Sequence, residues 1–406
     1  MNRRGNRVIS KRDYLSYVKD DSGVALITAL VILVLLTALG TYAINMTEIE
    51  GMLAGNLKAS KQAFYLADAG IEWGRQQIAV SPLLPPVPAD ATQSLNAGGY
   101  TVRFRNPFPA VPALEYTVRV EADGNIGTAS KTLHAVVTKT FNLSDGAIAI
   151  RGKEADSAFT GNAFLVDGRD YNHLDDTLTS LPPQLGISVQ SATHESDVEG
   201  ALTSSQRDRI KGLDGTASDP SVGVSSSSSS STITTLANEL CDDPSAIRLN
   251  TPNNGTLTLN GNNTWGTRAS PKIYCVDGVG DPGYAGVDVD INGNFSGAGV
   301  LVVRNAELIA KGNFKFEGLV IVTGAKVGFG MVGGGQQDVY GAVMINETWG
   351  DSEDFQQLVL KGNASVKRSQ SALAMAGQSI PAAALASIIP GLPSSTQRVS
   401  WVEVNP

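Results

Sequence analysis

The chain has few of the side chains from which catalytic sites are built. It contains 3 histidines and 2 cysteines, and 6% of its residues are aromatic. His134, His173 and His194 are widely separated in the sequence, and His134 falls inside a predicted strand, where an imidazole usually packs or faces water. The Gly-x-Ser-x-Gly, Walker-loop and His-Glu-x-x-His motifs are all missing. We therefore expect no enzymatic activity and no cofactor.

The chain also lacks an excess of basic charge. Its formal net charge is -8 at pH 7 and its pI is about 5.0. Nucleic-acid binding requires basic side chains that neutralise phosphates, so this balance excludes nucleic acid as an expected partner. The exception is the N-terminal segment, where Asp13, Asp20 and Asp21 are outnumbered by Arg3, Arg4, Arg7, Lys11, Arg12 and Lys19. This local excess predicts a cytoplasmic N-terminus and translocation of everything after Ile44.

Charge is missing altogether between Val24 and Ile44. As a helix with a rise of about 1.5 Å per residue, this run spans about 31 Å, which matches one bilayer core. A small-x-small cleavage site, typical of a secretory signal, is not found after the run, whereas the small pair Ser22–Gly23 lies before it. Moving these apolar side chains into water would cost on the order of 20–40 kcal/mol. The sequence therefore predicts a retained helix that sits in a membrane or in another apolar core.

The pair Ser22–Gly23 in front of an apolar helix resembles the leader of class III prepilins. In that family a peptidase on the cytoplasmic side cuts after the glycine. The resemblance implies a leader over residues 1–23, cleavage between Gly23 and Val24, and methylation of the new N-terminus.

Two later segments, residues 52–56 (MLAGN) and 62–72 (QAFYLADAGIE), resemble the N-terminal domain of PilX-type minor pilins. The resemblance covers about residues 20–75. It implies that the helix lies in the membrane and then in a filament, through Leu26, Ile27, Thr28, Leu30 and Leu33. The sequence departs from the family at two positions, because Val24 replaces the usual phenylalanine and Thr28 replaces the usual glutamate.

The resemblance implies a minor pilin that takes part in assembly of a type IV pilus. The bulk of the part after the helix and the missing glutamate at position 28 favour a tip or priming subunit that takes part in surface adhesion. Its expected partners are the prepilin peptidase, the inner membrane before assembly, and other pilins and minor pilins afterwards. The body is then periplasmic, and later extracellular at the pilus tip. Two alternatives stay open: a membrane-anchored periplasmic β-solenoid enzyme acting on polysaccharide, and a minor pseudopilin of a type II secretion system.

Apolar and small residues at steps of three and four extend the helix beyond the membrane span to about Ala79, just before Ser81-Pro82. We assign the helix to residues 24–80. Glycines at positions 51, 55, 70 and 74 weaken it by about 0.5–1 kcal/mol each relative to alanine. Two interpretations stay open: a continuous amphipathic helix, or a helix whose stretch Gly51–Gly55 melts on entry into a filament.

A small antiparallel head is predicted over residues 81–141, which gives an α+β fold together with the long helix. Residues 82–98 are rich in proline and indicate a linker. Residues 123–125, Asp-Gly-Asn, have turn chemistry. Apolar and polar residues alternate in three segments, which predicts strands at residues 100–105, 114–121 and 132–140.

The following unit, residues 142–376, contains a repeat. Residues 292–303 (NGNFSGAGVLVV) and 311–322 (KGNFKFEGLVIV) share Gly-Asn-Phe, a glycine and four apolar residues at an interval of about 19, and residues 160–168 are an outlying copy. Short strands joined by Gly-Asn corners predict a parallel β-solenoid. The apolar quartets 300–303 and 319–322 are expected to fill its lumen. An irregular β-sandwich is the alternative.

Residues 172–250 are predicted to be an insertion in this unit. Short helices are expected near residues 199–211 and 235–240, and Ser225–Ser231 is expected to be a flexible loop that is too polar to pack. The tail, residues 377–406, contains one more alternating segment, 397–404. This final strand either caps the solenoid or returns to the head sheet.

Cys241 and Cys275 both lie in the part predicted to be translocated. In an oxidising compartment they are expected to form a disulfide that closes a loop of about 35 residues. Two buried thiols are the alternative.

The sequence Asp288-Val-Asp290-Ile-Asn292-Gly293 copies the first half of a calcium loop. Gly299 occupies the position that needs a bidentate carboxylate, so a polar face of a strand is the simpler interpretation and we assign no metal. With Asp277 and Asp281, these residues form the best acidic cluster on which a solenoid enzyme could build a catalytic site.

Overall fold

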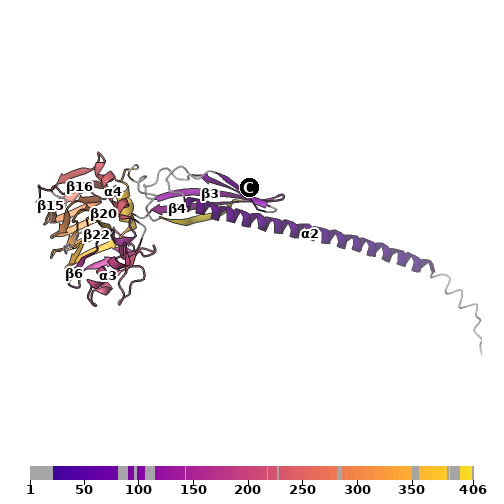
Figure 1. The fold of residues 1–406 in the computed structure, drawn as a ribbon. Coiled ribbons are helices and arrows are strands. Elements are labelled where there is room, and N and C mark those ends of the chain that lie inside the picture. Colours follow the sequence, from indigo (N-terminus) through magenta and orange to yellow (C-terminus); the bar gives the residue numbers. More distant parts are fainter. Residues whose placement is uncertain are drawn as a thin grey trace, which may run out of the picture.

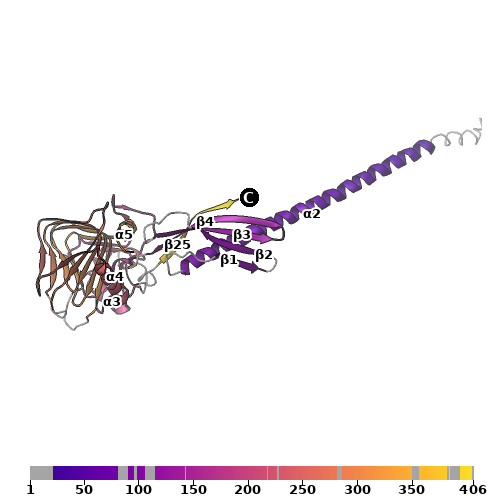
Figure 2. The same ribbon diagram turned by 90° about the horizontal axis from the view of Figure 1, so that it is seen from above.

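The structure is a computed structural model that describes residues 22–80, 90–95, 98–105, 115–141, 143–216, 218–225, 228–280, 286–349, 356–381, 384 and 394–404. A long helix, a small antiparallel sheet on its second half and a larger β domain follow one another along the molecule (Figures 1 and 2). The predicted long apolar helix followed by a mainly β region with parallel sheets is confirmed. Residues 1–21 of the predicted leader, and Asp281 of the acidic cluster, lie outside the described residues.

Helix α2 runs without a break from Ser22 to Val80. Its side chains are exposed from residue 24 to residue 58. Beyond that point small and apolar residues three or four positions apart face the head sheet and are buried there, namely Ala63, Ala67, Ile71, Gly74 and Ile78. The helix is therefore a free rod at one end and one layer of a packed domain at the other.

The head sheet has five antiparallel strands in the order β1-β2-β3-β4-β25. Their bounds are β1 Ala91–Leu95, β2 Gly98–Arg105, β3 Glu115–Ile126, β4 Ala129–Phe141 and β25 Ser394–Val404. Strand β25 pairs with β4 from Ser394↔Phe141 to Val404↔Thr132. The tail strand thus returns to the head sheet, so the larger domain is inserted between β4 and β25.

Two sequence predictions for the head are wrong. The stretch predicted as a linker contains strand β1, whose exposed polar residues at a sheet edge give no alternating signal. The predicted turn at residues 123–125 lies inside β3, and the chain turns at Gly127, which has a φ of 56°. Gly124 has another role, because a Cβ at that position would collide with the α2 backbone at Ala63 and Ala67.

The larger domain, residues 143–381, is called the coiled domain here. The chain alternates between a six-stranded and a twelve-stranded sheet, and every pair within these two sheets is parallel. The strands of the smaller sheet are, in spatial order, β14 Leu257–Leu259, β17 Asp288–Ile291, β19 Glu307–Ala310, β21 Phe329–Met331, β23 Leu358–Lys361 and β6 Ser157–Thr160. Each passage through both sheets is one coil.

The larger sheet follows the same stacking order. Its main path is β13 Ile247–Asn250, β16 Lys272–Asp277, β18 Asn294–Arg304, β20 Asn313–Gly324, β22 Gln337–Glu347, β24 Ala364–Arg368, β7 Leu165–Asp167 and β11 Ile210–Lys211. Off this path lie β15 Asn262–Trp265 beside β18, β5 Gly146–Ile150 beside β22, and β10 Leu185–Val189 and β12 Val222–Val224 beyond β5.

Stacked glycines make the bend in the middle of each long strand. Strands β18 and β20 pair over their whole length, so the repeat interval in the sequence is the register in space. Gly299, Gly318 and Gly341 line up across β18, β20 and β22 with φ values of 123°, 137° and 138°. A Cβ at Gly318 or Gly341 would meet the carbonyl of the glycine one coil away. The bend therefore requires glycine. Of the Gly-Asn pairs, Gly161, Gly261 and Gly362 have positive φ, whereas Gly293 and Gly312 do not.

The apolar quartets do not fill the lumen as a unit. Alternate residues of a strand face opposite sides, so Leu301, Val303, Val320 and Val322 join the core between the two sheets. Val300, Val302, Leu319 and Ile321 face outward and pack against helices α4 (Ser230–Asp242) and α5 (Gln370–Gly377). The prediction is half right, because these helices provide a second apolar layer.

The outlying copy of the repeat closes the stack. Strand β6 pairs with β23, which places Thr160 beside Lys361, and β7 pairs with β24. The first coil in the sequence thus lies next to the last. The chain enters at one end, passes along the outside through α4, and winds back from the far end (Figure 1).

The region predicted to be an insertion belongs to the same stack. It supplies strands β10, β11 and β12, together with helix α3 (Ala192–Gly200), the 3-10 turn Arg207–Arg209 and the hairpin β8 (Tyr171–Asn172) and β9 (Thr177–Leu178). Helix α3 ends at Gly200, so it lies almost entirely before residues 199–211, where the sequence predicted a helix. Parallel pairing with distant strands, which leaves no local pattern, explains the difference.

The serine run is not a loop throughout. Ser229 caps α4 by accepting a hydrogen bond from the Thr232 amide at 3.2 Å, and Ser230 and Ser231 form the first turn. Ser228 is buried. Serine is a strong N-cap residue, so its position before an apolar helix outweighs its polarity.

Candidate functional site

The predicted membrane and filament residues lie on the free half of α2. Leu26, Ile27, Leu30 and Leu33 are between 59 and 68% exposed. The helix is long and apolar enough to cross a membrane, and its most apolar stretch is fully exposed. Among the residues that the structure describes, none packs on this surface, and an exposed apolar surface of this extent is typical of a membrane or protein contact.

Thr28, at the predicted mature position 5, satisfies its hydroxyl within the helix. Its Oγ1 donates a hydrogen bond to the Val24 carbonyl at 2.7 Å. Thr37 and Thr41 make the same bond to the residue four positions earlier. Such internal bonds allow a hydroxyl to enter an apolar surrounding without an external partner. A glutamate at position 28 would need a cation there, and Thr28 needs none.

The four glycines between residues 51 and 74 of α2 divide into two kinds. A Cβ at Gly70 would meet Ala122 at 2.9 Å and one at Gly74 would meet Val120 at 2.6 Å, so these glycines let the sheet approach the helix. Gly51 and Gly55 have no neighbour within 4 Å, and α2 stays helical there. Packing on the head therefore explains Gly70 and Gly74, whereas no contact within the described part of the chain explains Gly51 and Gly55.

The end of α2 is held by groups from the sheet. Lys139 of β4 donates to the carbonyls of Ile78 and Ala79 at 3.0 and 2.8 Å, at the negative end of the helix dipole. Burial lowers the pKa of this lysine. On the outer side, Arg398 of β25 lies 3.8 Å from Asp68 and 3.5 Å from Glu72. The rod is thus fixed to the head by both its last turn and the returning tail strand.

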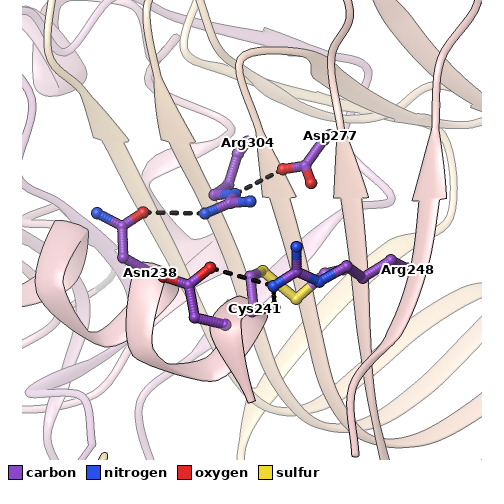
Figure 3. The surroundings of a disulfide bond; sticks show 7 residues. Asn238, Cys241, Arg248, Asp277 and Arg304 are labelled. Atoms are coloured by element: carbon purple, nitrogen blue, oxygen red, sulfur yellow. Dashed lines mark hydrogen bonds and ion pairs between the residues drawn. A yellow bond between two sulfur atoms is a disulfide. The ribbon is translucent and has the colours of Figure 1, made fainter. Parts of the chain in front are cut away.

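The predicted disulfide is present. Cys241 at the end of α4 is bonded to Cys275 of β16, and their Cα atoms are 5.6 Å apart (Figure 3). Arg304 of β18 donates to Asn238 of α4 at 3.1 Å and to Asp277 of β16 at 2.6 Å. Arg248 donates to the Cys241 carbonyl. These contacts fix α4 over the outer face of the larger sheet at the far end of the stack.

The acidic residues proposed for calcium lie on the outer face of the smaller sheet. Asp290 of β17 is paired with Lys311 at 2.5 Å, and Asn292 is exposed after the strand ends. Among the residues that the structure describes, no group of three or more His, Cys, Asp and Glu could hold a metal ion. Asp277 belongs to the other sheet, so the predicted acidic cluster does not come together. The polar strand face is the interpretation that fits.

The prediction missed Glu307, which opposes Asp288 in the next coil. Burial, followed by the charges of Asp288 and Asp290, raises the pKa of Glu307 to about 7. Burial and Asp290 also raise the pKa of Asp288. The repeat interval of 19 residues between Asn294 and Asn313, applied to Asp288, would have located Glu307.

Helix α2 is the part of the molecule that resembles a known protein family. Residues 22–72 match the family model described as PilX N-terminal. The N-terminal segment is pilin-like. No curated protein matches the chain. Among solved structures, that of the competence-associated pilin ComZ from Thermus thermophilus aligns with 85% of this chain and 98% of its own, at 11% identity and a TM-score of 0.22.

Proposed function

We propose that the protein is a minor pilin of a type IV pilus, cleaved between Gly23 and Val24 and carried from the inner membrane to the pilus tip. The observation that supports this proposal is the bare apolar half of α2 within the segment that matches the PilX N-terminal model. An apolar surface leaves lipid only for a partner that is equally apolar, and a bundle of pilin helices is such a partner. The partners are the prepilin peptidase, other pilins and minor pilins.

The side chains of the rod support a position at a filament end. With Thr28 in place of glutamate, this subunit has no carboxylate for the N-terminal amine of a neighbouring subunit, whereas its own amine can still pair with a neighbour's carboxylate. Its electrostatic pairing is therefore one-sided. A subunit that pairs on one side only fits the end of a helical array.

The bulk of the body supports the same position. The coiled domain lies at the far end of the head from the rod (Figure 2). A domain of this size at every subunit step would crowd a thin fibre, but a single copy at an end meets no such neighbour. In this position the coiled domain is the part that meets surfaces, which is the adhesive role we assign to it.

The processing step is tested by Gly23→Val in the full chain, with Gly40→Val as the matched control. Gly40 lies in the same apolar helix and has no neighbour within 4 Å, so its substitution changes the helix without touching the cleavage pair. We expect mass spectrometry to find Val24 as the N-terminus of the wild type and the control, and an uncleaved leader in Gly23→Val. We also expect the uncleaved variant to be missing from sheared pili.

The tip position is tested by immunogold labelling of the coiled domain on intact pili. Label at fibre ends supports it, and even labelling along the fibre contradicts it. Co-purification with a secretion pseudopilus instead of with pili would favour the pseudopilin alternative. Wild-type protein recovered with its leader attached, and never with filaments, would overturn the whole proposal.

A further inference from the structure

The outer face of the coiled domain carries a groove of about 540 Å³ that runs across successive coils. Its floor is made by the first halves of the long strands β18, β20 and β22 and by strand β15, on the N-terminal side of the glycine bends. Its lining combines exposed polar residues, among them Asn262, Thr264, Asn294 and Ser296, with the buried aromatic residues Phe295, Phe314 and Tyr340. The helices α4 and α5 cover the other halves of these strands and leave this half open.

An asparagine ladder forms one side of the groove. Asn294 donates from Nδ2 to Oδ1 of Asn262 at 2.9 Å, and Asn313 donates in the same way to Asn294 at 2.9 Å. The backbone N–H of Gln336 then donates to Oδ1 of Asn313 at 3.0 Å. A carboxamide has two donor hydrogens and two acceptor lone pairs. The two inner members of the ladder, Asn294 and Asn313, therefore each keep one donor and one acceptor for a ligand, held in fixed directions by the ladder.

The charged groups near the groove neutralise one another. Lys315 is 3.2 Å from Glu317, and Arg268 makes two hydrogen bonds to Glu317 at 2.5 and 2.7 Å. Lys367 is paired with Asp176 at 2.7 Å, and Asp338, a further carboxylate, lines the groove. A nucleic-acid strand or an acidic polymer requires an excess of cations, which this face does not have. The groove thus offers hydrogen bonds without a net charge.

The geometry of the floor suits a linear ligand. Neighbouring strands lie about 4.8 Å apart, a distance comparable to the length of one sugar ring. The ladder therefore presents a donor and an acceptor at each such step. Asp338 and Lys315, opposite one another on β22 and β20, continue the polar surface beside the ladder.

From the fixed amide ladder, the neutral charge balance and the step between coils, we propose that this groove binds a neutral oligosaccharide, whose hydroxyls both donate and accept hydrogen bonds. The bound oligosaccharide lies along the stack of coils and crosses strands β15, β18 and β20. This inference names the ligand class for the adhesive part of the proposed function and rests on that part, but it does not depend on processing or on position in a filament.

The test measures binding of neutral hexasaccharides to the full chain in detergent micelles by isothermal titration calorimetry. The probes are β-1,4-glucan, β-1,4-linked N-acetylglucosamine, α-1,4-glucan and α-1,6-mannan hexamers, with a DNA duplex as the charged comparison. Thr264→Arg places a long side chain in the groove, and Thr258→Arg places the same side chain on an exposed position of β14 in the other sheet. We expect at least one hexamer to bind, and Thr264→Arg to weaken its binding about tenfold or more (about 1.4 kcal/mol) while Thr258→Arg leaves it unchanged.

Asn294→Leu provides the second variant, because it keeps the size of an exposed side chain and removes the amide. We expect a loss of about fivefold or more in affinity, with thermal unfolding unchanged. Binding of none of the four hexamers, binding that survives Thr264→Arg, or binding of DNA alone would each overturn the inference. Piliation and leader removal in the Thr264→Arg strain report separately on the proposed function, so the two can fail independently.

Discussion

Gly124 is the residue at which helix and sheet come closest. A Cβ there would collide with backbone atoms of Ala63 and Ala67, and backbone cannot move aside as a flexible side chain can. We expect Gly124→Ala to lower the free energy of unfolding of the head by about 1–3 kcal/mol. Circular dichroism of the full chain during thermal unfolding measures this. The matched control is Gly55→Ala in the free part of α2, which has open space around it and should not lower that free energy.

Glu307 makes the coiled domain sensitive to pH. Its pKa is raised from 4.5 to about 7 by burial and by Asp288 and Asp290, so the folded state favours the protonated form. The stabilisation is present in full below about pH 4.5 and is lost as the pH rises through about 7, by at most about 3 kcal/mol. We expect Glu307→Gln to raise the melting temperature at pH 8 and to leave it nearly unchanged at pH 4.

The control for this pH effect is Glu239→Gln, an exposed glutamate on α4. It should not alter the difference in melting temperature between the two pH values. A Glu307→Gln variant with the same pH profile as the wild type would show that the three carboxylates do not interact. The position of Glu307 could have been predicted from the repeat, because the register of the coils determines which residue lies opposite Asp288.

At the scale of elements, helix α4 depends on the disulfide between Cys241 and Cys275. The helix covers Val300 and Val302 of β18. Side chains of the sheet also donate hydrogen bonds to it, from Arg304, Arg248 and Asn346. In the chain-entropy model, a bridge closing a loop of 34 residues contributes about 3–4 kcal/mol. We expect the double variant Cys241→Ser/Cys275→Ser to lose about that much stability, with faster hydrogen exchange across α4.

Reduction of the wild-type protein should reproduce the exchange pattern of this double variant, and the head strands should keep their protection in both. Protection of α4 that is unchanged without the bridge would assign the anchoring to the apolar contacts alone.

The elements that the sequence predicts are those whose signal is local or repeated. The long apolar helix follows from an uncharged run, and the pairing of β18 with β20 follows from a repeat that is also the register. The returning strand β25 depends on a partner far away in the chain, whereas β1 pairs with its neighbour β2 at the sheet edge and lacks an alternating pattern. A pattern within β25 predicts a strand, but only packing decides that it pairs with β4. The serine run was predicted to be a loop for a related reason. A serine such as Ser229 can be recognised as an N-cap only when the helix that follows it, here α4, has been predicted to begin there.

At the scale of the whole molecule, the topology makes the coiled domain an insertion that the head can lose. Phe141, at the end of β4, is paired with Ser394, at the start of β25. Partners in an antiparallel pair have Cα atoms about 5 Å apart, a gap that a two-residue turn spans. The head therefore needs strand β25, but it does not need the 252 residues between Phe141 and Ser394.

This leads to a prediction that separates the two proposed roles. We join Phe141 to Ser394 through Asn-Gly, the turn preferred in two-residue hairpins. The shortened protein should keep α2 and the five-stranded sheet, lose its leader and enter pili, because the rod and its anchors at Lys139 and Arg398 remain. It should no longer bind the hexasaccharide that the full chain binds. A version that also lacks residues 394–404 serves as the control, since an uncovered β4 edge should prevent the head from folding. If the shortened protein folds, as judged by circular dichroism, but stays in the membrane fraction, then the coiled domain itself contributes to assembly, and the division between a rod that assembles and a cargo that binds is wrong.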